Sequence, residues 1–167
     1  RFRNPRVLEI DASGDIIVLD QLNHSIRKIS ASGSVSTIAG NGTQGYMDGT
    51  GSNARFFSPT GLAISSNGDY FVGENSNGTI RRVTPAGLVT TFAGTAGLFG
   101  TADGTSSAAR FGAIRGMDFD SNGDLYVADL TNHNIRKITP SGVVTTFAGV
   151  TGMAGHQDGN VGSAKFN

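Results

Sequence analysis

Four charged residues form two arginine–carboxylate pairs, each with its members three residues apart. They are Arg6 with Glu9 and Arg115 with Asp118. At the matching places in the middle of the chain, Thr60 and Ala63 are both uncharged. Each pair can form a local ion pair that neutralises two partly buried charges. Alternatively, if the pairs surround a common axis, they form a ring of alternating charge that binds an anion or a cation, and these four residues are the ligand-binding candidates.

Two histidines each follow an acidic residue by four positions. The pairs are Asp20 with His24 and Asp129 with His133. Because both pairs occupy the same position in a repeated unit, we expect the histidine to touch the carboxylate across a turn and to lock a loop. Zinc sites and nucleophilic sites need several converging ligands, or a base beside an activated group. We therefore predict no catalytic residues, no metal site and no cofactor.

Three Asp-Gly pairs lie in long glycine-rich loops, and a basic residue follows each aspartate seven positions later. The aspartates are Asp48, Asp103 and Asp158, and the basic residues are Arg55, Arg110 and Lys165. This spacing predicts a turn with an Asp–Arg tie that orders the loop. The tips of the same loops offer a second interpretation, because binding residues often lie on loops held by a rigid scaffold. The recognition candidates are Tyr46, Leu98, Phe99 and Met153.

The composition excludes several classes of protein. The 167 residues have a net charge of +0, without the excess of basic residues that is typical of nucleic-acid binding. The absence of cysteine excludes a disulfide scaffold and a cysteine-ligated zinc site. No apolar run is long enough to span a bilayer, so no membrane-spanning segment is predicted. The chain starts at Arg1 instead of Met, and we expect it to be an excised or processed piece of a longer protein.

The elements that must position these residues come from a unit that repeats along the whole chain. Phe2, Phe56, Phe111 and Phe166 mark the period, as do Gly33, Gly87 and Gly142. A fixed period of this size, about 55 residues, indicates blades, coils or array units. The predicted units are 1–54, 55–109 and 110–164, and residues 165–167 start a further repeat.

Each unit reads as a four-stranded antiparallel meander with tight hairpins. In the third unit the predicted strands are 116–120, 124–129, 134–139 and 143–148. The turn at Asn122–Gly123 separates the first two, because Asn and Gly tolerate the positive φ of tight turns. Sustained helical periodicity is absent, so we expect almost no helix. Repeated four-stranded units predict an all-β chain of three propeller blades.

The repeat resembles the NHL family, which is named for an Asn-His-Leu element. That element corresponds to Asn23–His24 and Asn132–His133, just before the third strand of a unit, while 59–63 opens a first strand and 126–129 closes a second. The departures from the family pattern are Gly78 in place of histidine, Glu74 in place of aspartate, and Ala113–Ile114 where proline is favoured. The resemblance covers the whole chain and implies a β-propeller, usually of six blades.

Three blades cannot close around an axis, because a propeller needs about four or more. A three-blade wedge would expose an apolar face at each end, and such faces predict association. We therefore expect two copies to form a two-fold homodimer with six blades. A natural propeller cut short is the other interpretation, and both can hold.

The predicted function is a non-catalytic, self-assembling scaffold that binds a protein or a small ligand. One alternative is a metal-dependent lyase or hydrolase, which the family resemblance allows and which would use Glu9 and Asp118 at the axis. A second alternative is an RNA-binding NHL domain, which the balanced charge disfavours. The richness in Gly, Ser, Thr and Asn resembles bacterial surface or secreted NHL arrays, and we expect such a location.

Overall fold

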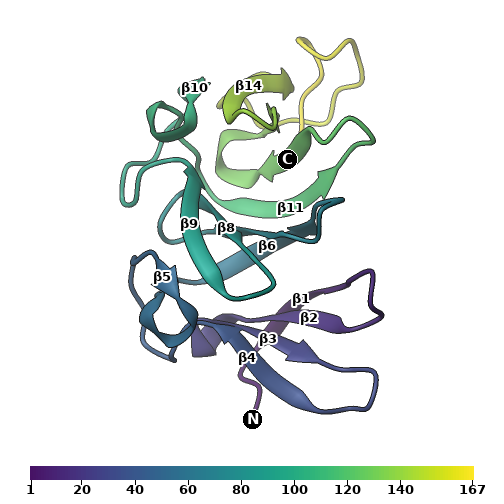
Figure 1. Cartoon of the computed structure of the whole chain (residues 1–167). Coiled ribbons are helices and arrows are strands. Elements are labelled where there is room, and N and C mark those ends of the chain that lie inside the picture. The colour runs from purple at the N-terminus through teal and green to yellow at the C-terminus, as the bar shows by residue number, and fades with distance from the viewer.

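Three antiparallel β-sheets, stacked one on another, make up the computed structural model, which describes residues 1–167 (Figure 1). The first sheet contains β1 (Pro5–Ile10), β2 (Ile16–Asp20), β3 (Ser25–Ile29) and β4 (Val35–Ala39). The second contains β5 (Gly49–Thr50), β6 (Pro59–Ile64), β7 (Tyr70–Glu74), β8 (Thr79–Val83) and β9 (Leu88–Ala93). The third contains β10 (Gly104–Thr105), β11 (Ile114–Phe119), β12 (Leu125–Asp129), β13 (Asn134–Ile138) and β14 (Val143–Ala148). The all-β prediction is confirmed, and the three sheets are consistent with propeller blades.

The hairpins form where the sequence places turn residues. In the turn between β11 and β12, Gly123 has a φ of +82°. The carboxylate of Asp120 accepts hydrogen bonds from the amides of Asn122 and Asp124, both at 2.9 Å. The Asp124 amide is the main reason that the pKa of Asp120 is lowered. The predicted strands of the third unit agree with the structure to within two residues at each end.

The short strands β5 and β10 differ from the prediction of four strands in every unit. β5 belongs to the loop after the first sheet, yet it pairs with the outer strand of the second, with Gly49 opposite Val89. β10 pairs in the same way with β14. The second and third sheets therefore have five strands, and the first has four. A two-residue strand carries no alternating pattern, so the sequence could not reveal it.

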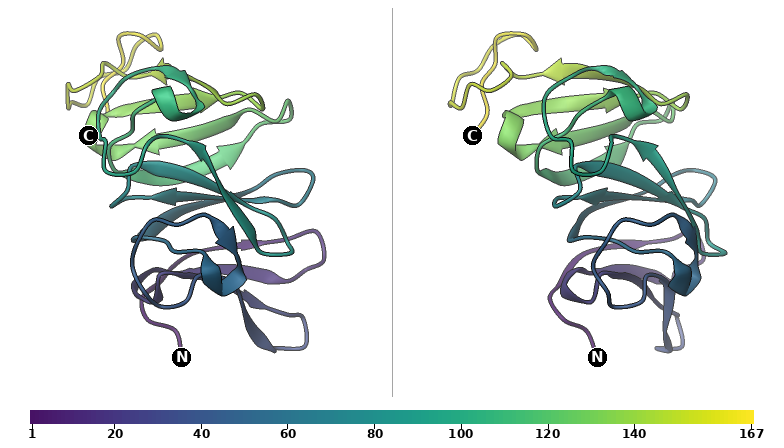
Figure 2. Two further views of the ribbon diagram at one scale, coloured as in Figure 1. Left: turned by 60° about the vertical axis from the view of Figure 1, so that its left-hand side comes forward. Right: turned by 90° about the vertical axis from the view of Figure 1, so that its left-hand side faces the viewer.

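Two hydrophobic cores lie between the sheets. One packs the first sheet on the second, and the other packs the second sheet on the third. β6 lies between β1 and β11, which places the first strands of all three sheets side by side (Figure 2). β6 and β11 approach closely because Gly61 has no side chain: a Cβ there would lie 2.7 Å from the Arg115 carbonyl oxygen.

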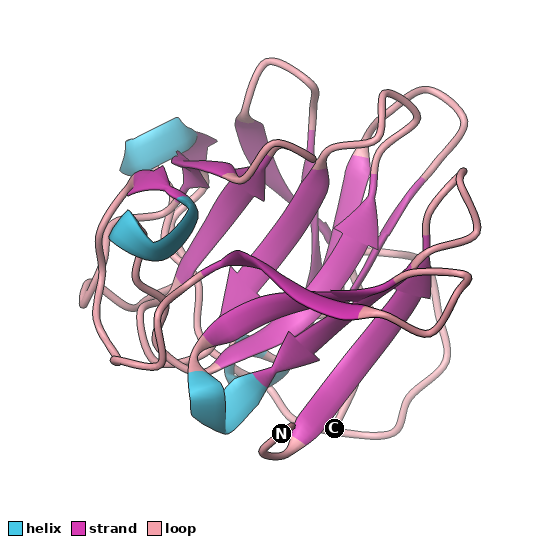
Figure 3. Cartoon of the chain, turned by 60° about the horizontal axis from the view of Figure 1, so that its bottom comes forward, coloured by secondary structure: helices cyan, strands magenta, loops and turns pink.

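Helix is confined to four three-residue 3-10 turns (Figure 3). They are η1 (Gln21–Asn23), η2 (Gly51–Asn53), η3 (Ser106–Ala108) and η4 (Leu130–Asn132). No helix has the length and apolar character needed to cross a membrane.

Candidate functional site

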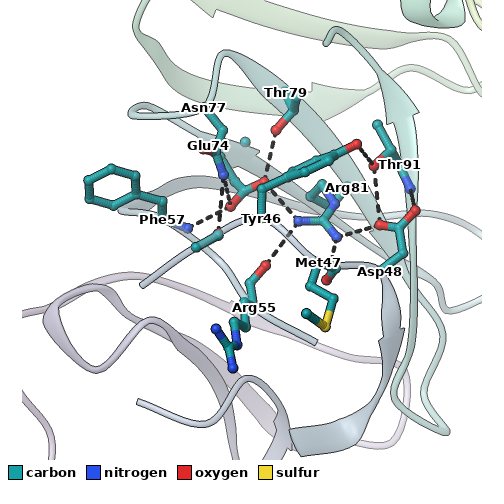
Figure 4. Close-up of polar contacts among 12 residues, drawn as sticks. Tyr46, Met47, Asp48, Arg55, Phe57, Glu74, Asn77, Thr79, Arg81 and Thr91 are labelled. Atoms are coloured by element: carbon teal, nitrogen blue, oxygen red, sulfur yellow. Dashed lines mark hydrogen bonds and ion pairs between the residues drawn. The ribbon is translucent and has the colours of Figure 1, made fainter. Parts of the chain in front are cut away.

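A buried carboxylate in the second sheet is held by four donors (Figure 4). Glu74, at the end of β7, has no exposed surface. Its Oε1 accepts from the Phe57 amide at 2.7 Å and from Asn77 Nδ2 at 3.0 Å. Its Oε2 accepts from Thr79 Oγ1 at 2.8 Å and from Arg81 at 3.0 Å. Burial raises the pKa of Glu74, and the Arg81 guanidinium is the strongest opposing influence.

The other side of the buried Arg81 guanidinium holds the loop that precedes the second sheet. Arg81 donates to the carbonyl oxygens of Met47 at 3.0 Å and Arg55 at 3.2 Å. It also forms an ion pair with Asp48. The ring of Tyr46 covers the guanidinium, with 4.8 Å from the ring centroid to Arg81 Cζ. One arginine thus joins the end of β7 to a loop that is distant in the sequence.

The third sheet repeats this arrangement with a looser carboxylate. Arg136 donates to Asp103 at 2.7 Å and to two loop carbonyl oxygens. Asp129 replaces Glu74 and stands 3.7 Å from the Arg136 guanidinium. Both oxygens of Asp129 accept from the Gly112 amide at 3.0 Å, and one accepts from Asn132 at 2.7 Å. Burial raises the pKa of Asp129, while these donors oppose the rise.

The predicted loop tie therefore has a different partner from the one expected. Asp48 and Asp103 pair with the arginines of the third strands, 33 residues away, and not with Arg55 or Arg110 seven residues away. Arg55 and Arg110 instead contribute their backbone carbonyl oxygens, which accept from Arg81 and Arg136. Asp158, in the loop after the third sheet, has neither a hydrogen bond nor an ion pair.

The expected contact between histidine and acid is also not formed. His24 ends η1 in the left-handed conformation, with a φ of +47°, and its Nδ1 accepts from the Ser58 amide at 3.4 Å. The carboxylate of Asp20 instead accepts from Asn23 at 2.8 Å and approaches Arg27 at 3.4 Å. The histidine therefore contacts the neighbouring sheet through Ser58 and Phe57, and not the acid of its own sheet.

The same correction applies to His133. It has a φ of +54°, and Asp129 is bound by Asn132 instead. His133 Nδ1 is buried without a hydrogen-bond partner.

The arginine–carboxylate pairs of the inner strands do not form the local ion pairs that were one expectation. No ion pair joins Arg6 to Glu9 or Arg115 to Asp118. The carboxylates of Glu9 and Asp118 instead approach each other from opposite sides of β6. Burial raises the pKa of Glu9, and the negative charge of Asp118 raises it further. The structure contains no group of three or more His, Cys, Asp or Glu side chains that could hold a metal ion.

Three of the four loop candidates project from the loops. Leu98, Phe99 and Met153 are each about half exposed. Tyr46 is different, because its ring rests on Arg81 and its hydroxyl lies 2.7 Å from Thr91 Oγ1.

A cavity of about 410 Å³ lies between the hairpin tips of the second and third sheets, and the sequence did not indicate it. Phe71, Phe92 and Phe119 line it, and the Phe71 ring packs edge-on against each of the other two at 5.0 Å. Its polar rim includes Asp120 and Asn67. A comparison between repeats could have revealed the cavity. The first unit has isoleucine at all three aromatic positions, namely Ile10, Ile17 and Ile38.

Each third strand carries two consecutive basic residues, namely Arg27–Lys28, Arg81–Arg82 and Arg136–Lys137, and those of the second and third sheets are engaged within the fold. Arg81 and Arg136 have no exposed surface. Their neighbours pair with acids from the preceding hairpin: Arg82 with Asp69, and Lys137 with Asp124. These doublets therefore present little uncompensated positive charge.

Comparisons with known proteins support the architecture. No family model matches the chain. The protein Suppressor of Quenching 1, chloroplastic, of Arabidopsis thaliana is 39% identical over 71 residues, which are 42% of this chain and 7% of that protein. The chain therefore spans a small part of this curated relative.

Solved structures match over most of the chain. A Bacteroides thetaiotaomicron protein of unknown function gives a TM-score of 0.78 at 24% identity, over 96% of this chain and 39% of that one. An auxiliary nutrient binding protein from the same species gives 0.69 at 23% identity, over 83% and 36%. The virginiamycin B lyase of Staphylococcus aureus gives 0.58 at 19% identity, over 86% and 40%. These neighbours are β-propeller-like, and at such identities the likeness defines the fold alone.

Proposed function

We propose that the chain is a non-catalytic β-propeller module of the NHL type that acts as a scaffold for a protein or small-ligand partner. One observation carries the proposal: the buried charged groups at the ends of the second strands and on the third strands are bonded in ties that hold the scaffold together. Glu74, Arg81 and Arg136 are fully buried and bonded to neighbouring backbone or side chains. The groups left for a partner are the apolar loop tips and the aromatic cavity.

The NHL assignment is supported by what its signature residues do. His24 and His133 occupy the same left-handed corner in two sheets. The acids that close the second strands, Asp20 and Asp129, each fasten the start of their own sheet through a backbone amide. A signature made of corner and fastening residues specifies a blade and leaves the ligand to other positions.

The cavity fits a small ligand with a flat apolar ring. Three phenylalanine rings supply edges and faces for aromatic packing. The carboxylate of Asp120 and the amide of Asn67, at the rim, can meet a polar group on the ligand. Apolar walls with a few polar groups are the usual composition of a small-molecule site.

Indole is a suitable probe, because it combines a flat ring with a single N–H donor. We expect saturable shifts of the backbone amide signals of residues 65–69 and 120–124 in NMR titrations. Phe119→Ile, which installs the residue type of the first two units, should abolish saturation. Phe99→Ser changes an exposed loop aromatic and should leave it intact. Unsaturable shifts, or equal shifts in Phe119→Ile, would refute the cavity as a site.

A metal-dependent lyase or hydrolase remains a second candidate because of Glu9 and Asp118. Their mutual approach at the inner strands raises the pKa of Glu9. A rise in Tm with Ca²⁺ or Zn²⁺ that disappears in Glu9→Gln would support this candidate. An unchanged Tm would count against it.

A further inference from the structure

The two end sheets expose residues that the middle sheet buries at the same repeat positions. On β1, Leu8 is 59% exposed, whereas the matching Leu62 on β6 is 2% exposed. At the other end, Phe147 on β14 is 43% exposed, whereas the matching Phe92 is partly buried against the core between the second and third sheets. Leu62 belongs to the core that faces the first sheet. The face with Leu8 therefore corresponds to one that receives a preceding sheet, and the face with Phe147 to one that receives a following sheet.

The first sheet also lacks the outer strand that the others have. In the second sheet, Gly49 of β5 pairs with Val89, which is fully buried. Val35 occupies the position of Val89 in the first sheet and is 43% exposed. Residues 159–160, in the loop after the third sheet, match β5 and β10 in the repeat and pair with no strand. One end has a loop segment at the position of a short outer strand but no sheet edge beside it, and the other end has a sheet edge without such a strand.

The charges at the two ends are complementary in the same way. Asp48 and Asp103 each bind the arginine that lies 33 residues later, in the sheet that follows. Asp158 holds the third of these positions and has no arginine after it. Arg27 holds the first of the arginine positions and has no loop acid before it. The side chain of Arg27 is 18% exposed, whereas those of Arg81 and Arg136 are fully buried.

A buried acceptor marks the same surface of the third sheet. His24 Nδ1 accepts from the Ser58 amide of the following sheet. His133 has the same conformation, but its Nδ1 is unpartnered. In the repeat, Asn4 holds the place of Ser58. A buried acceptor without a donor is costly, so a backbone amide supplied at this point is stabilising.

We infer that a second copy of this chain docks head-to-tail, with the loop after the third sheet of one copy completing the first sheet of the other. Residues 159–160 add beside β4, Asp158 pairs with the partner's Arg27, and His133 Nδ1 accepts from the partner's Asn4. A two-fold axis makes two such contacts and unites six sheets, which is within the usual range for propellers. The inference rests on the propeller scaffold proposed above and names the partner that completes it.

The contact is expected to be reversible. Lys165 and Phe166 hold the same repeat position as Arg1 and Phe2. At each contact, therefore, Lys165 and Phe166 of one copy compete for one place with the partner's Arg1 and Phe2, and one pair must move away. The dimer should therefore dissociate on dilution.

The test is the mass of the intact chain, measured by light scattering on a sizing column across a dilution series. We expect a species of twice 17.2 kDa that gives way to monomer on dilution. Arg27→Asp alone and Asp158→Arg alone should each shift the transition to at least tenfold higher concentration, because each places like charges at both contacts. Mixing the two variants should restore the dimer, since one contact is then native and the other has its charges exchanged.

Arg55→Asp makes the same charge change as Arg27→Asp, but in the loop between the first and second sheets and away from both ends, so it should leave the transition unchanged. Circular dichroism checks that each variant is folded. If Arg27→Asp fails to fold, Asp158→Arg still tests the contact, because it changes an exposed loop residue. A monomer at all concentrations overturns the inference, as does a dimer that is insensitive to Asp158→Arg. Failure to restore the dimer on mixing overturns the charge pairing. Indole binding is read separately, so the two proposals can fail independently.

Discussion

The second and third sheets place the same arginine in the same position but hold it differently. In the second sheet, Glu74 reaches Arg81 at 3.0 Å and forms a hydrogen bond. In the third, Asp129 is shorter by one methylene and stands 3.7 Å from Arg136. The loop side of the tie is alike in both, with an aspartate and two carbonyl oxygens.

The two sheets also differ at their inner strands. Gly61 on β6 faces the third sheet across a gap too small for a side chain, whereas the matching Gly116 on β11 has open space. The repeat therefore dictates the loop attachment, while each sheet adjusts its carboxylate and its packing to its neighbours. The middle sheet depends most on these details, because it alone is packed on both faces.

The largest effect is expected from removing the arginine. Arg81→Ala leaves Glu74 buried without its counter-charge and frees the loop, at a cost of about 3–5 kcal/mol. Arg136→Ala should cost about 1–3 kcal/mol, because Asp129 stands 3.7 Å from the guanidinium and loses no hydrogen bond to it. Urea unfolding followed by circular dichroism measures both. Equal losses would mean that the closer approach of Glu74 to its arginine has no energetic weight.

A smaller effect is expected from filling the gap between the sheets. Gly61→Ala places a Cβ 2.7 Å from a backbone carbonyl oxygen that cannot move alone, at a cost of about 1–3 kcal/mol. Gly116→Ala meets only Ala128 Cβ at 4.0 Å, so at concentrations where the chain is monomeric its stability should be unchanged or slightly raised. Thermal unfolding of the two variants in parallel checks the contrast, which fails if Gly116→Ala is the more damaging.

Next comes the exchange of one carboxylate for the other. Glu74→Asp gives the second sheet the acid of the third and lengthens the bonds to Arg81 and Thr79. We expect a loss of about 1–2 kcal/mol in the free energy of unfolding. If Glu74→Asp is as stable as the parent, the shorter acid satisfies the site equally well.

The smallest effect concerns the inner strands. Asp118→Asn removes a negative charge and should lower the pKa of Glu9 toward its ordinary value of 4.5, while burial still holds it higher. Because the pKa of Glu9 is raised in the folded state, its contribution to the free energy of unfolding is fully present below the unfolded-state pKa. That contribution is lost as the pH rises through the folded-state pKa. Asp118→Asn should therefore reduce the stability that is lost when Glu9 ionises above its folded-state pKa. Carbon-13 NMR of the Glu9 carboxyl measures the shift, and an unchanged pKa would show that burial alone raises it.

The sequence predicted the features that depend on local pattern. Turn residues such as Gly123 and the β-forming residues of 143–148 were sufficient for the hairpins and strands. The period of the repeat was sufficient for the number of sheets. These features form within one unit and need no knowledge of how units are placed.

Features that join distant segments were not predictable in the same way. The spacing of seven residues suggested a tie from Asp48 to Arg55, but the loop turns so that Asp48 meets Arg81 instead. The aromatic cavity needs Phe119 of one sheet over Phe71 of another, and sequence spacing does not specify that placement. The Ser58 amide as the partner of His24 is likewise a contact between two sheets, which the spacing of four residues between Asp20 and His24 does not specify.

The borrowed strands β5 and β10 have a consequence for the order of folding during synthesis. Each lies upstream of the sheet that it completes, because β5 is made before β9 and β10 before β14. The segment that completes the outer edge of the second or the third sheet is therefore synthesised before the strand with which it pairs. Each of these two sheets can thus be linked to its predecessor only once its own last long strand, β9 or β14, has been made.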